Sequence, residues 1–165
     1  MNIFEPNKIL QSYKDFDIDD FRKRGYKTIL LDVDNTITPY YQKTPDEEAR
    51  AFVKRLKDAG FEVIVYSNNT NKRVSSTAKT IECEYVCWAF KPLPFKCWSL
   101  LKKKGFDKKT TLCMGDQLIT DVLCGKLAGI YAIYVKPISE VDSFNTSVNR
   151  FFERLIFKYV LHEKV

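Results

Sequence analysis

Histidine is almost absent from this chain: its 165 residues contain a single one, His162, near the C-terminus. A multi-histidine metal centre is therefore excluded, and a serine–histidine–aspartate hydrolase has little support. The cysteines, five in all, are an odd number. Cys83 and Cys87 lie four apart, but no second pair or nearby histidine completes a zinc site, so we expect reduced, mostly buried thiols.

Long apolar runs are also lacking. No stretch approaches the roughly 18–20 apolar residues of a membrane span. Residues 1–12 include an acidic side chain and lack the basic-then-apolar layout of a signal peptide. Motifs for RNA or DNA binding are not apparent, and we expect no nucleic-acid partner. These absences indicate a cytoplasmic protein.

What is present is the composition of a folded domain. At 165 residues and 45% hydrophobic, the chain is long enough for a substantial core, and we expect a single domain over 1–165 with its core at about 26–136. The net charge of +6 fits either a solvated basic surface or an anionic partner. Such a partner would be a phosphorylated substrate or an acidic membrane face.

Strand and helix patterns alternate along the chain, which predicts an α/β fold with a mainly parallel sheet between two layers of helices. The expected strands cover residues 27–33, 61–66, 85–87, 110–114 and 130–135, and the expected helices cover 45–59, 71–80, 94–104 and 120–127.

An amphipathic helix is expected near the C-terminus, over about 148–161. One stripe of it is apolar and consists of Phe151, Phe152, Leu155, Ile156, Tyr159 and Val160. The stripe could pack on the sheet or on a neighbouring subunit. Alternatively, with the basic residues beside it, it could make a peripheral membrane contact.

Polar residues of particular kinds follow four of the predicted strands. They are Asp32 and Asp34, then Ser67 and Asn68, then Lys91, and finally Asp116 with Asp121 five residues on. The carboxyl ends of parallel strands share one edge of a sheet, so we expect these side chains in one crevice.

The chemistry of that set points to phosphate. Four neighbouring carboxylates repel one another unless a cation neutralises them, and oxygen ligands without histidine or cysteine favour Mg²⁺. The metal, Lys91 and the Ser67 hydroxyl would bind a phosphate. One aspartate could then attack phosphorus, and the other could protonate the leaving oxygen and activate water.

The motifs resemble those of the haloacid dehalogenase-like (HAD) superfamily, and more narrowly its subfamily IIIA. The resemblance rests on Asp32-Val33-Asp34-Asn35-Thr36, Ser67-Asn68-Asn69, Lys91-Pro92 and Gly115-Asp116-Gln117-Leu118-Ile119-Thr120-Asp121. The chain is also similar, over nearly its whole length, to small bacterial phosphatases related to mitochondrial phosphatidylglycerophosphate phosphatase. That likeness includes Asn149-Arg150 and Glu153-Arg154.

The resemblance implies a Mg²⁺-dependent phosphomonoester hydrolase with a Rossmann-like HAD fold. Asp32 would form an aspartyl-phosphate, and Asp34 would act as general acid and then base, with its backbone carbonyl on Mg²⁺. Ser67 and Lys91 would hold the phosphoryl oxygens, with a further contact from Asn68. Asp116 would ligate Mg²⁺, and Asp121 would complete or orient the metal shell.

The spacing of the motifs leaves no room for a cap domain. Only 32 residues separate Asp34 from Ser67 and 23 separate Ser67 from Lys91, and the predicted helices and strands consume most of them. An open site suits a large or surface-bound substrate. Phosphatidylglycerophosphate is the leading candidate, and a soluble sugar or nucleotide phosphate or a phosphoprotein is the alternative.

Two other classes of protein stay open at this point. A receiver domain also gathers acids, a hydroxyl and a lysine around Mg²⁺, but it normally carries its acceptor aspartate on a later strand. A non-catalytic phosphate-binding module on the same fold is the second. The oligomeric state cannot be predicted from these features.

Overall fold

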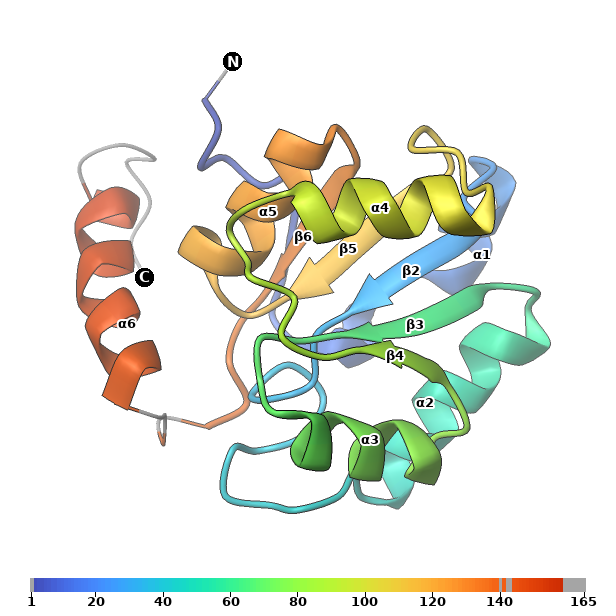
Figure 1. Ribbon diagram of the computed structural model, residues 1–165, viewed down its shortest axis with the longest axis horizontal. Coiled ribbons are helices and arrows are strands. Elements are labelled where there is room, and N and C mark those ends of the chain that lie inside the picture. The colour runs from blue at the N-terminus through green and yellow to red at the C-terminus, as the bar shows by residue number, and fades with distance from the viewer. Residues whose placement is uncertain (1, 140, 142–143, 159–165) are drawn as a thin grey trace.

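The computed structural model describes residues 2–139, 141 and 144–158, with side chains in the last stretch from residue 149 onward. At its centre lies a six-stranded sheet in which every neighbouring pair of strands is parallel (Figure 1). The strand order is β1-β6-β5-β2-β3-β4. The strands are β1 (Lys8–Leu10), β2 (Thr28–Leu31), β3 (Glu62–Tyr66), β4 (Glu84–Val86), β5 (Thr111–Gly115) and β6 (Tyr131–Val135). The predicted α/β fold with a parallel sheet is confirmed.

Helices cover both faces of the sheet and make three layers (Figure 1). Because successive side chains of a strand alternate, Ile29 and Leu31 of β2 pack on one face while Leu30 packs on the other. The first face is covered by α1 (Ile18–Lys23), α2 (Glu47–Asp58) and α3 (Asn71–Thr80), and the second by α4 (Phe95–Lys104) and α5 (Leu123–Ala128). The last helix in the described part of the chain is α6 (Phe144–Ile156).

Local signals explain where these helices begin and end. Helix α2 buries four residues at helical spacing, Ala49, Phe52, Val53 and Leu56. Its N-cap is Asp46, whose Oδ1 accepts a hydrogen bond of 2.8 Å from the backbone N–H of Ala49. The expected helix over 120–127 differs in form, because a π-helical turn (Leu118–Val122) precedes α5. That turn carries Asp121 towards the site described below.

The connections beside the site are short. Between β2 and β3 the described chain contains one helix, α2, and between β3 and β4 it contains one helix, α3. Neither connection has room for an inserted domain, which confirms the expected lack of a cap over this part of the described chain.

The sequence patterns predict no element before residue 27, yet this region forms β1, a 3₁₀ turn (Tyr13–Asp15) and α1. Strand β1 pairs with β6 at the edge of the sheet. Phe16 and Phe21 are buried, and their rings stack with centroids 4.6 Å apart. The sheet therefore extends one strand further than expected.

The apolar stripe of the C-terminal helix is divided. Ile156 is partly buried against the core, whereas Phe151, Phe152 and Leu155 are exposed. Phe157, which is not part of the predicted stripe, is buried with its ring centroid 5.4 Å from that of Tyr134. Tyr159, Val160 and His162 lie outside the described residues. Contact of the exposed members with a neighbouring subunit or a membrane stays a prediction. No described helix has the length and apolar character needed to cross a bilayer.

Candidate active site

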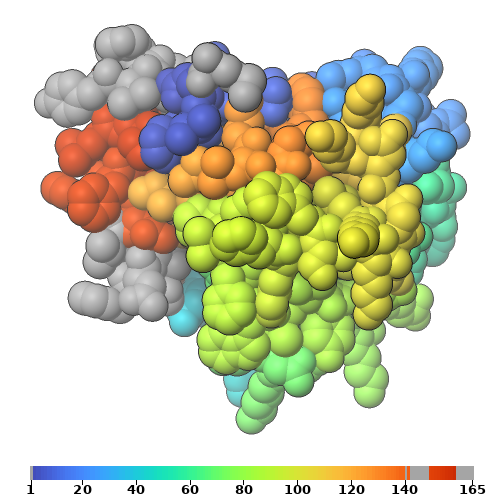
Figure 2. Space-filling model, turned by 45° about the horizontal axis from the view of Figure 1, so that its top comes forward, coloured from blue at the N-terminus to red at the C-terminus, as the bar shows by residue number. Residues whose placement is uncertain are grey.

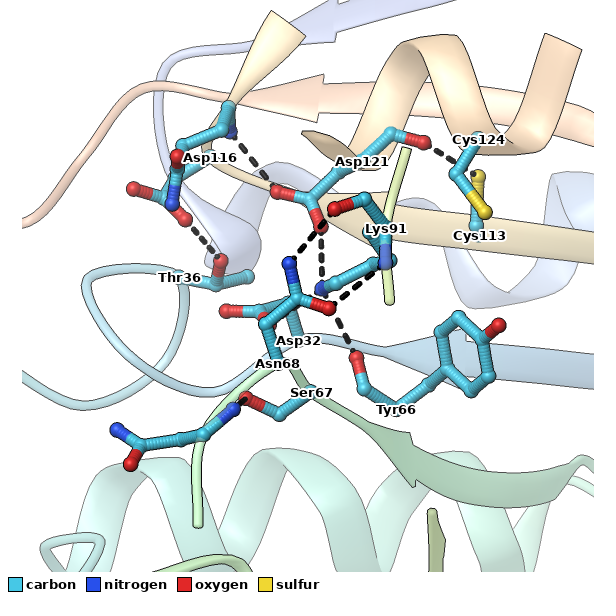
Figure 3. A network of polar contacts seen from close by, with 12 residues as sticks. Asp32, Thr36, Tyr66, Ser67, Asn68, Lys91, Cys113, Asp116, Asp121 and Cys124 are labelled. Carbon is cyan, nitrogen blue, oxygen red and sulfur yellow. Dashed lines mark hydrogen bonds and ion pairs between the residues drawn. The ribbon is translucent and has the colours of Figure 1, made fainter. Parts of the chain in front are cut away.

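The strand-end residues meet at the carboxyl edge of the sheet, where β2, β3 and β5 lie side by side (Figure 3). Asp32 follows β2, Ser67 follows β3, and Asp116 follows β5, and all three are buried. Lys91 is buried as well, and it reaches the same place from the connection between β4 and α4.

Lys91 joins two of the predicted carboxylates. Its Nζ lies 2.7 Å from Asp32 Oδ1 and 2.5 Å from Asp121 Oδ1, and it donates a third hydrogen bond of 3.0 Å to the carbonyl of Tyr66. A buried ammonium with three acceptors has every N–H satisfied. Removing one of these charges would leave its partners buried and uncompensated, a costly state.

Burial and the neighbouring charges shift the pKa values of Asp32 and Lys91. Burial raises the pKa of Asp32 to about 7, against the lowering effect of Lys91 and with further raising by Asp121 and Asp34. Burial lowers the pKa of Lys91, but the carboxylates of Asp121 and Asp32 outweigh it and raise that pKa above its usual value. Lys91 is therefore positively charged. The negative charges of Asp121 and Asp34 oppose the ionisation of Asp32.

Asn68 fixes the backbone that carries Lys91. Its side-chain Nδ2 donates to the Lys91 carbonyl at 2.8 Å, and its Oδ1 accepts from the Lys91 N–H at 2.7 Å. Both ends of the Asn68 amide are thus committed to Lys91. A direct phosphate contact by this side chain stays a prediction.

Asp34 lies at the rim of the same site, away from Lys91. Arg73 of α3 contacts its Oδ1 with two nitrogens, at 2.6 and 3.1 Å, and Asn69 Nδ2 donates to its Oδ2 at 2.9 Å. The backbone N–H of Asn69 also donates to Ser67 Oγ at 3.3 Å. Asn69 thereby links Asp34 at the rim to the buried Ser67.

The turn after Asp34 depends on Asn35, which has a positive φ of 59° and is buried. Asparagine tolerates this left-handed conformation better than most residues. Its Oδ1 accepts from the N–H of Tyr40 and its Nδ2 donates to the carbonyl of Val141, each at 2.9 Å. These bonds hold the loop that orients Asp34.

Asp116 has a cationic partner from the C-terminal helix. The guanidinium of Arg150 forms an ion pair with the Asp116 carboxylate, and it also contacts Glu153 at 3.1 Å. On its other side Asp116 accepts 3.0 Å from the hydroxyl of Thr36. Burial raises the pKa of Asp116 well above its usual value, although Arg150 lowers it. Glu153 is itself buried, and its Oε1 accepts from the Ile119 N–H at 3.1 Å.

A glycine makes room for Asp121. A Cβ at Gly115 would lie only 2.2 Å from Asp121 Cγ, well inside van der Waals contact. This close approach lets Asp121 Oδ2 accept from the Gln117 N–H at 3.0 Å while its Oδ1 reaches Lys91. Both oxygens of Asp121 are therefore used by groups of the protein.

The donor chemistry of this site fits a hard divalent cation such as Mg²⁺. Burial raises the pKa values of Asp32 and Asp116, with neighbouring acids adding to the effect, and a bound cation would stabilise the charged carboxylates. Within the described part of the chain, no three acidic, histidine or cysteine side chains are grouped closely enough to ligate a metal. Instead, the ammonium of Lys91 neutralises Asp32 and Asp121, and the guanidinium of Arg150 neutralises Asp116.

Sequence reasoning missed three residues of this site: Thr36, Arg73 and Arg150. Thr36 and Arg150 belong to the quoted motifs, but they received no role. Arg73 had no signal, because an arginine on a polar helix is ordinary at the surface. The seven predicted residues meet at one edge of the sheet. Asp32, Asp121 and Asn68 gather around Lys91, Asn69 joins Asp34 at the rim to the buried Ser67, and Asp116 lies beside Arg150.

Comparisons with known proteins agree with this geometry, although no family model matches the chain. It is 28% identical over 153 residues to "Probable phosphatase YqeG" of Bacillus subtilis, covering 93% of this chain and 89% of that protein. It is 23% identical over 146 residues to "Phosphatidylglycerophosphate phosphatase 1, chloroplastic/mitochondrial" of Arabidopsis thaliana. That match covers 83% of this chain but only 42% of the Arabidopsis protein.

Solved structures show the same fold at low identity. The cobalt-bound deoxy-D-mannose-octulosonate 8-phosphate phosphatase of Haemophilus influenzae superposes with a TM-score of 0.55 at 17% identity, covering 68% of this chain and 69% of that one. A protein of Streptomyces avermitilis, named as a HAD family hydrolase, gives a TM-score of 0.52 at 14% identity, covering 66% and 80%. The chain is thus similar over nearly its whole length to a protein named as a phosphatase, and it shares its fold with a protein named as a HAD family hydrolase. The motifs described above resemble those of the same superfamily, the haloacid dehalogenase-like proteins.

Proposed function

We propose that the protein hydrolyses phosphate monoesters through a covalent aspartyl-phosphate on Asp32. The observation that supports this most is the group around Lys91: a buried aspartate at a strand end whose Oδ1 lies 2.7 Å from a fixed ammonium. An ammonium in that position neutralises the phosphoryl oxygens as they approach the nucleophile.

The reaction has two steps. In the first, an oxygen of Asp32 attacks phosphorus, the ester P–O bond breaks, and Asp34 gives a proton to the departing alcohol. In the second, Asp34 takes a proton from a water that attacks the aspartyl-phosphate, releasing inorganic phosphate and restoring Asp32. Lys91 and the Ser67 hydroxyl hold the phosphoryl oxygens throughout, and Asn68 holds Lys91 and is assigned a further phosphate contact.

Mg²⁺ is the proposed cofactor, which when bound would offset the negative charge of the phosphoryl group. Asp32, Asp116 and the backbone carbonyl of Asp34 would hold it. Asp121 is assigned to orient this shell, since both of its oxygens already bond to Lys91 and Gln117. Asp116 would release Arg150 when it binds the metal.

The leading substrate is phosphatidylglycerophosphate, and the proposed location is the cytoplasm with a peripheral membrane contact. Three features support it: a site without a cap, the net charge of +6, and the similarity to the Arabidopsis protein. Because the chain spans under half the length of that relative, the alternative stays open. It is a soluble sugar or nucleotide phosphate or a phosphoprotein.

Turnover of p-nitrophenyl phosphate tests the reaction. We expect hydrolysis that EDTA abolishes and Mg²⁺ restores, and a loss of at least about 10³-fold in Asp32→Asn, since the nucleophile is removed. Full activity of Asp32→Asn would refute the mechanism. A phosphorylated protein that persists after a single turnover would favour a receiver domain, and phosphate binding without turnover would favour a binding module.

Phosphate release from lipid vesicles, compared with release from a panel of soluble phosphomonoesters, tests the substrate. A wide preference for the soluble panel would refute the lipid assignment while leaving the reaction type intact.

A further inference from the structure

A row of exposed aromatic and aliphatic side chains surrounds the segment that delivers Lys91. Its members, called here the aromatic face, are Tyr85, Trp88, Phe90, Leu93, Phe95 and Trp98. Phe90 is 61% exposed and Phe95 is 64% exposed, although both rings are large and apolar. In Figure 2 this segment, in green to yellow-green, lies at the front of the molecule.

Some members of the aromatic face contact one another or a lysine beside them. Lys96 Nζ lies 4.7 Å from the centroid of the Phe90 ring, and the rings of Phe95 and Trp98 meet edge-on at 5.8 Å. Trp98 is anchored by a hydrogen bond of 3.3 Å from its Nε1 to the carbonyl of Ala128. Exposed apolar side chains that form one group, rather than a scatter, mark an interaction surface.

The backbone is held in an unfavourable form that turns these rings outward. Trp88 and Phe90 have positive φ angles of 48° and 57°, a conformation that bulky L-residues rarely adopt. Ala89, which lies between these two residues, and Lys91, which follows Phe90, are both buried. The backbone N–H of Trp88 donates to the carbonyl of Asn69, and that of Ala89 donates to the carbonyl of Ser67. These bonds fix the alternation of exposed and buried side chains along this segment. The same backbone that points Lys91 into the site therefore points Trp88 and Phe90 away from it.

The charged side chains on this segment are lysines. Residues 85–106 contain five lysines and no aspartate or glutamate. Lys91 is buried in the site and Lys104 pairs with Glu84 at 2.5 Å, which leaves Lys96, Lys102 and Lys103 for the surface. On α4, Phe95, Trp98 and Lys102 recur at helical spacing and share one exposed stripe. Aromatic rings with lysines beside them suit the interface of an anionic bilayer, where rings enter the headgroup region and ammonium groups meet lipid phosphates.

We propose that the aromatic face docks the protein on an anionic lipid bilayer. This inference rests on the proposed function, because it places the bilayer beside the lysine that would bind a lipid phosphate. A second copy of the chain fits the face less well, since a two-fold interface would bring lysines against lysines. The exposed Phe151 and Phe152 of α6 offer a competing surface, which the test separates.

Intrinsic fluorescence tests the proposal without any substitution. The chain contains two tryptophans, Trp88 and Trp98, and both belong to the aromatic face. On adding vesicles of phosphatidylcholine with phosphatidylglycerol, we expect a blue shift and quenching by brominated acyl chains. Phosphatidylcholine alone should give much smaller changes. Sedimentation with the vesicles but no change in fluorescence would overturn the proposal, as would no binding at all.

Variants locate the contact. We expect Trp88→Ser/Phe90→Ser/Phe95→Ser to reduce partitioning onto the anionic vesicles by at least about tenfold, because it removes the apolar area that enters the bilayer. Lys102→Gln/Lys103→Gln should reduce it by about fivefold per lysine at low salt. The matched control, Phe151→Ser/Phe152→Ser, should change it by less than about twofold. Each variant should keep p-nitrophenyl phosphate hydrolysis.

The outcomes separate this proposal from the proposed function. Vesicle binding that needs the aromatic face, without phosphatase turnover, would refute the function and leave the docking surface standing. Turnover with unchanged partitioning of the triple variant would refute only the docking surface. Equal loss in the control, or self-association of the wild type that the triple variant abolishes, would also refute it.

Discussion

Asp32 and Asp34 are two residues apart in sequence, and they lie in contrasting regions of the site. Asp32 belongs to the interior, where its carboxylate is 8% exposed and contacts Lys91. Asp34 belongs to the rim, where its carboxylate is 18% exposed and contacts the long, flexible side chain of Arg73. An interior carboxylate requires its counter-charge to remain buried, whereas a rim carboxylate can exchange its partner for a substrate. The difference suits a fixed nucleophile and a proton carrier that meets the leaving group.

Removal of the interior cation should have the largest effect. We expect Lys91→Met to lower kcat by more than about 10³-fold and to reduce the free energy of unfolding by about 3–5 kcal/mol, because Asp32 and Asp121 stay buried without a partner. Urea denaturation and steady-state kinetics measure the two effects. Lys54→Met is the control: its pair with Asp58 is solvent-exposed, and its loss should cost less than about 1 kcal/mol. Wild-type stability of Lys91→Met would contradict the view of the interior as a coupled group.

At the rim, loss of the proton carrier should affect chemistry more than stability. We expect Asp34→Asn to lower kcat by about 10²–10⁴-fold for alkyl phosphates, whose leaving group needs a proton. The loss should be smaller for p-nitrophenyl phosphate, whose leaving group does not. A Brønsted plot over several leaving groups measures the contrast, and equal losses throughout would remove Asp34 from the acid role.

The interior should also make stability depend on pH. The pKa of Asp32 is about 7 in the folded chain, above its ordinary value of 3.8, so between these values the folded state holds a proton that the unfolded state releases. In metal-free buffer this group should therefore cost stability as pH rises from about 4 to 7, by an amount on the order of a few kcal/mol. Unfolding of the wild type and Asp32→Asn at several pH values isolates the effect. A constant difference between the two proteins would be the contrary result.

The smallest effect should come from the partner of the rim carboxylate. We expect Arg73→Ala to lower kcat/KM by about tenfold, with Arg73→Lys recovering part of the loss, because the ion pair orients Asp34 without taking part in bond breaking. In a double mutant with Asp34→Asn, the Arg73→Ala effect should nearly vanish. Fully additive losses would place Arg73 in contact with the substrate instead.

The interior was easier to predict from sequence than the rim partners. Asp32, Lys91 and Asp116 each follow a strand, and the edge of a parallel sheet is a location that strand order alone defines. Arg73 lies within α3, and its contact with Asp34 depends on how that helix is positioned over the sheet. No local pattern carries that information. Gly115 follows a predicted strand, but sequence alone does not explain why glycine is required there. The reason is the close approach of the Asp121 side chain, which only the three-dimensional structure reveals.

Strand β1 and the C-terminal helix α6 were harder to predict from sequence, each for a different reason. Strand β1 has three residues, too few for an alternation of apolar and polar side chains to be recognised. In α6, Glu153 is buried and the Arg150 side chain is only 12% exposed, whereas Phe151 and Phe152 are exposed. An amphipathic pattern predicts the reverse, because it cannot anticipate that charged side chains are drawn to the buried carboxylate of Asp116.

The pairing of β1 with β6 has a consequence for folding. Lys8 lies opposite Ile133, so β1 gains its partner in the sheet only when a strand far along the chain has formed. Arg150 lies further along still, and without it Asp116 lacks the cation that compensates its burial. Contacts between such distant parts of a chain slow folding, since a long loop must close before they form. The edge of the sheet at β1 and the ion pair at Asp116 should therefore form late in folding.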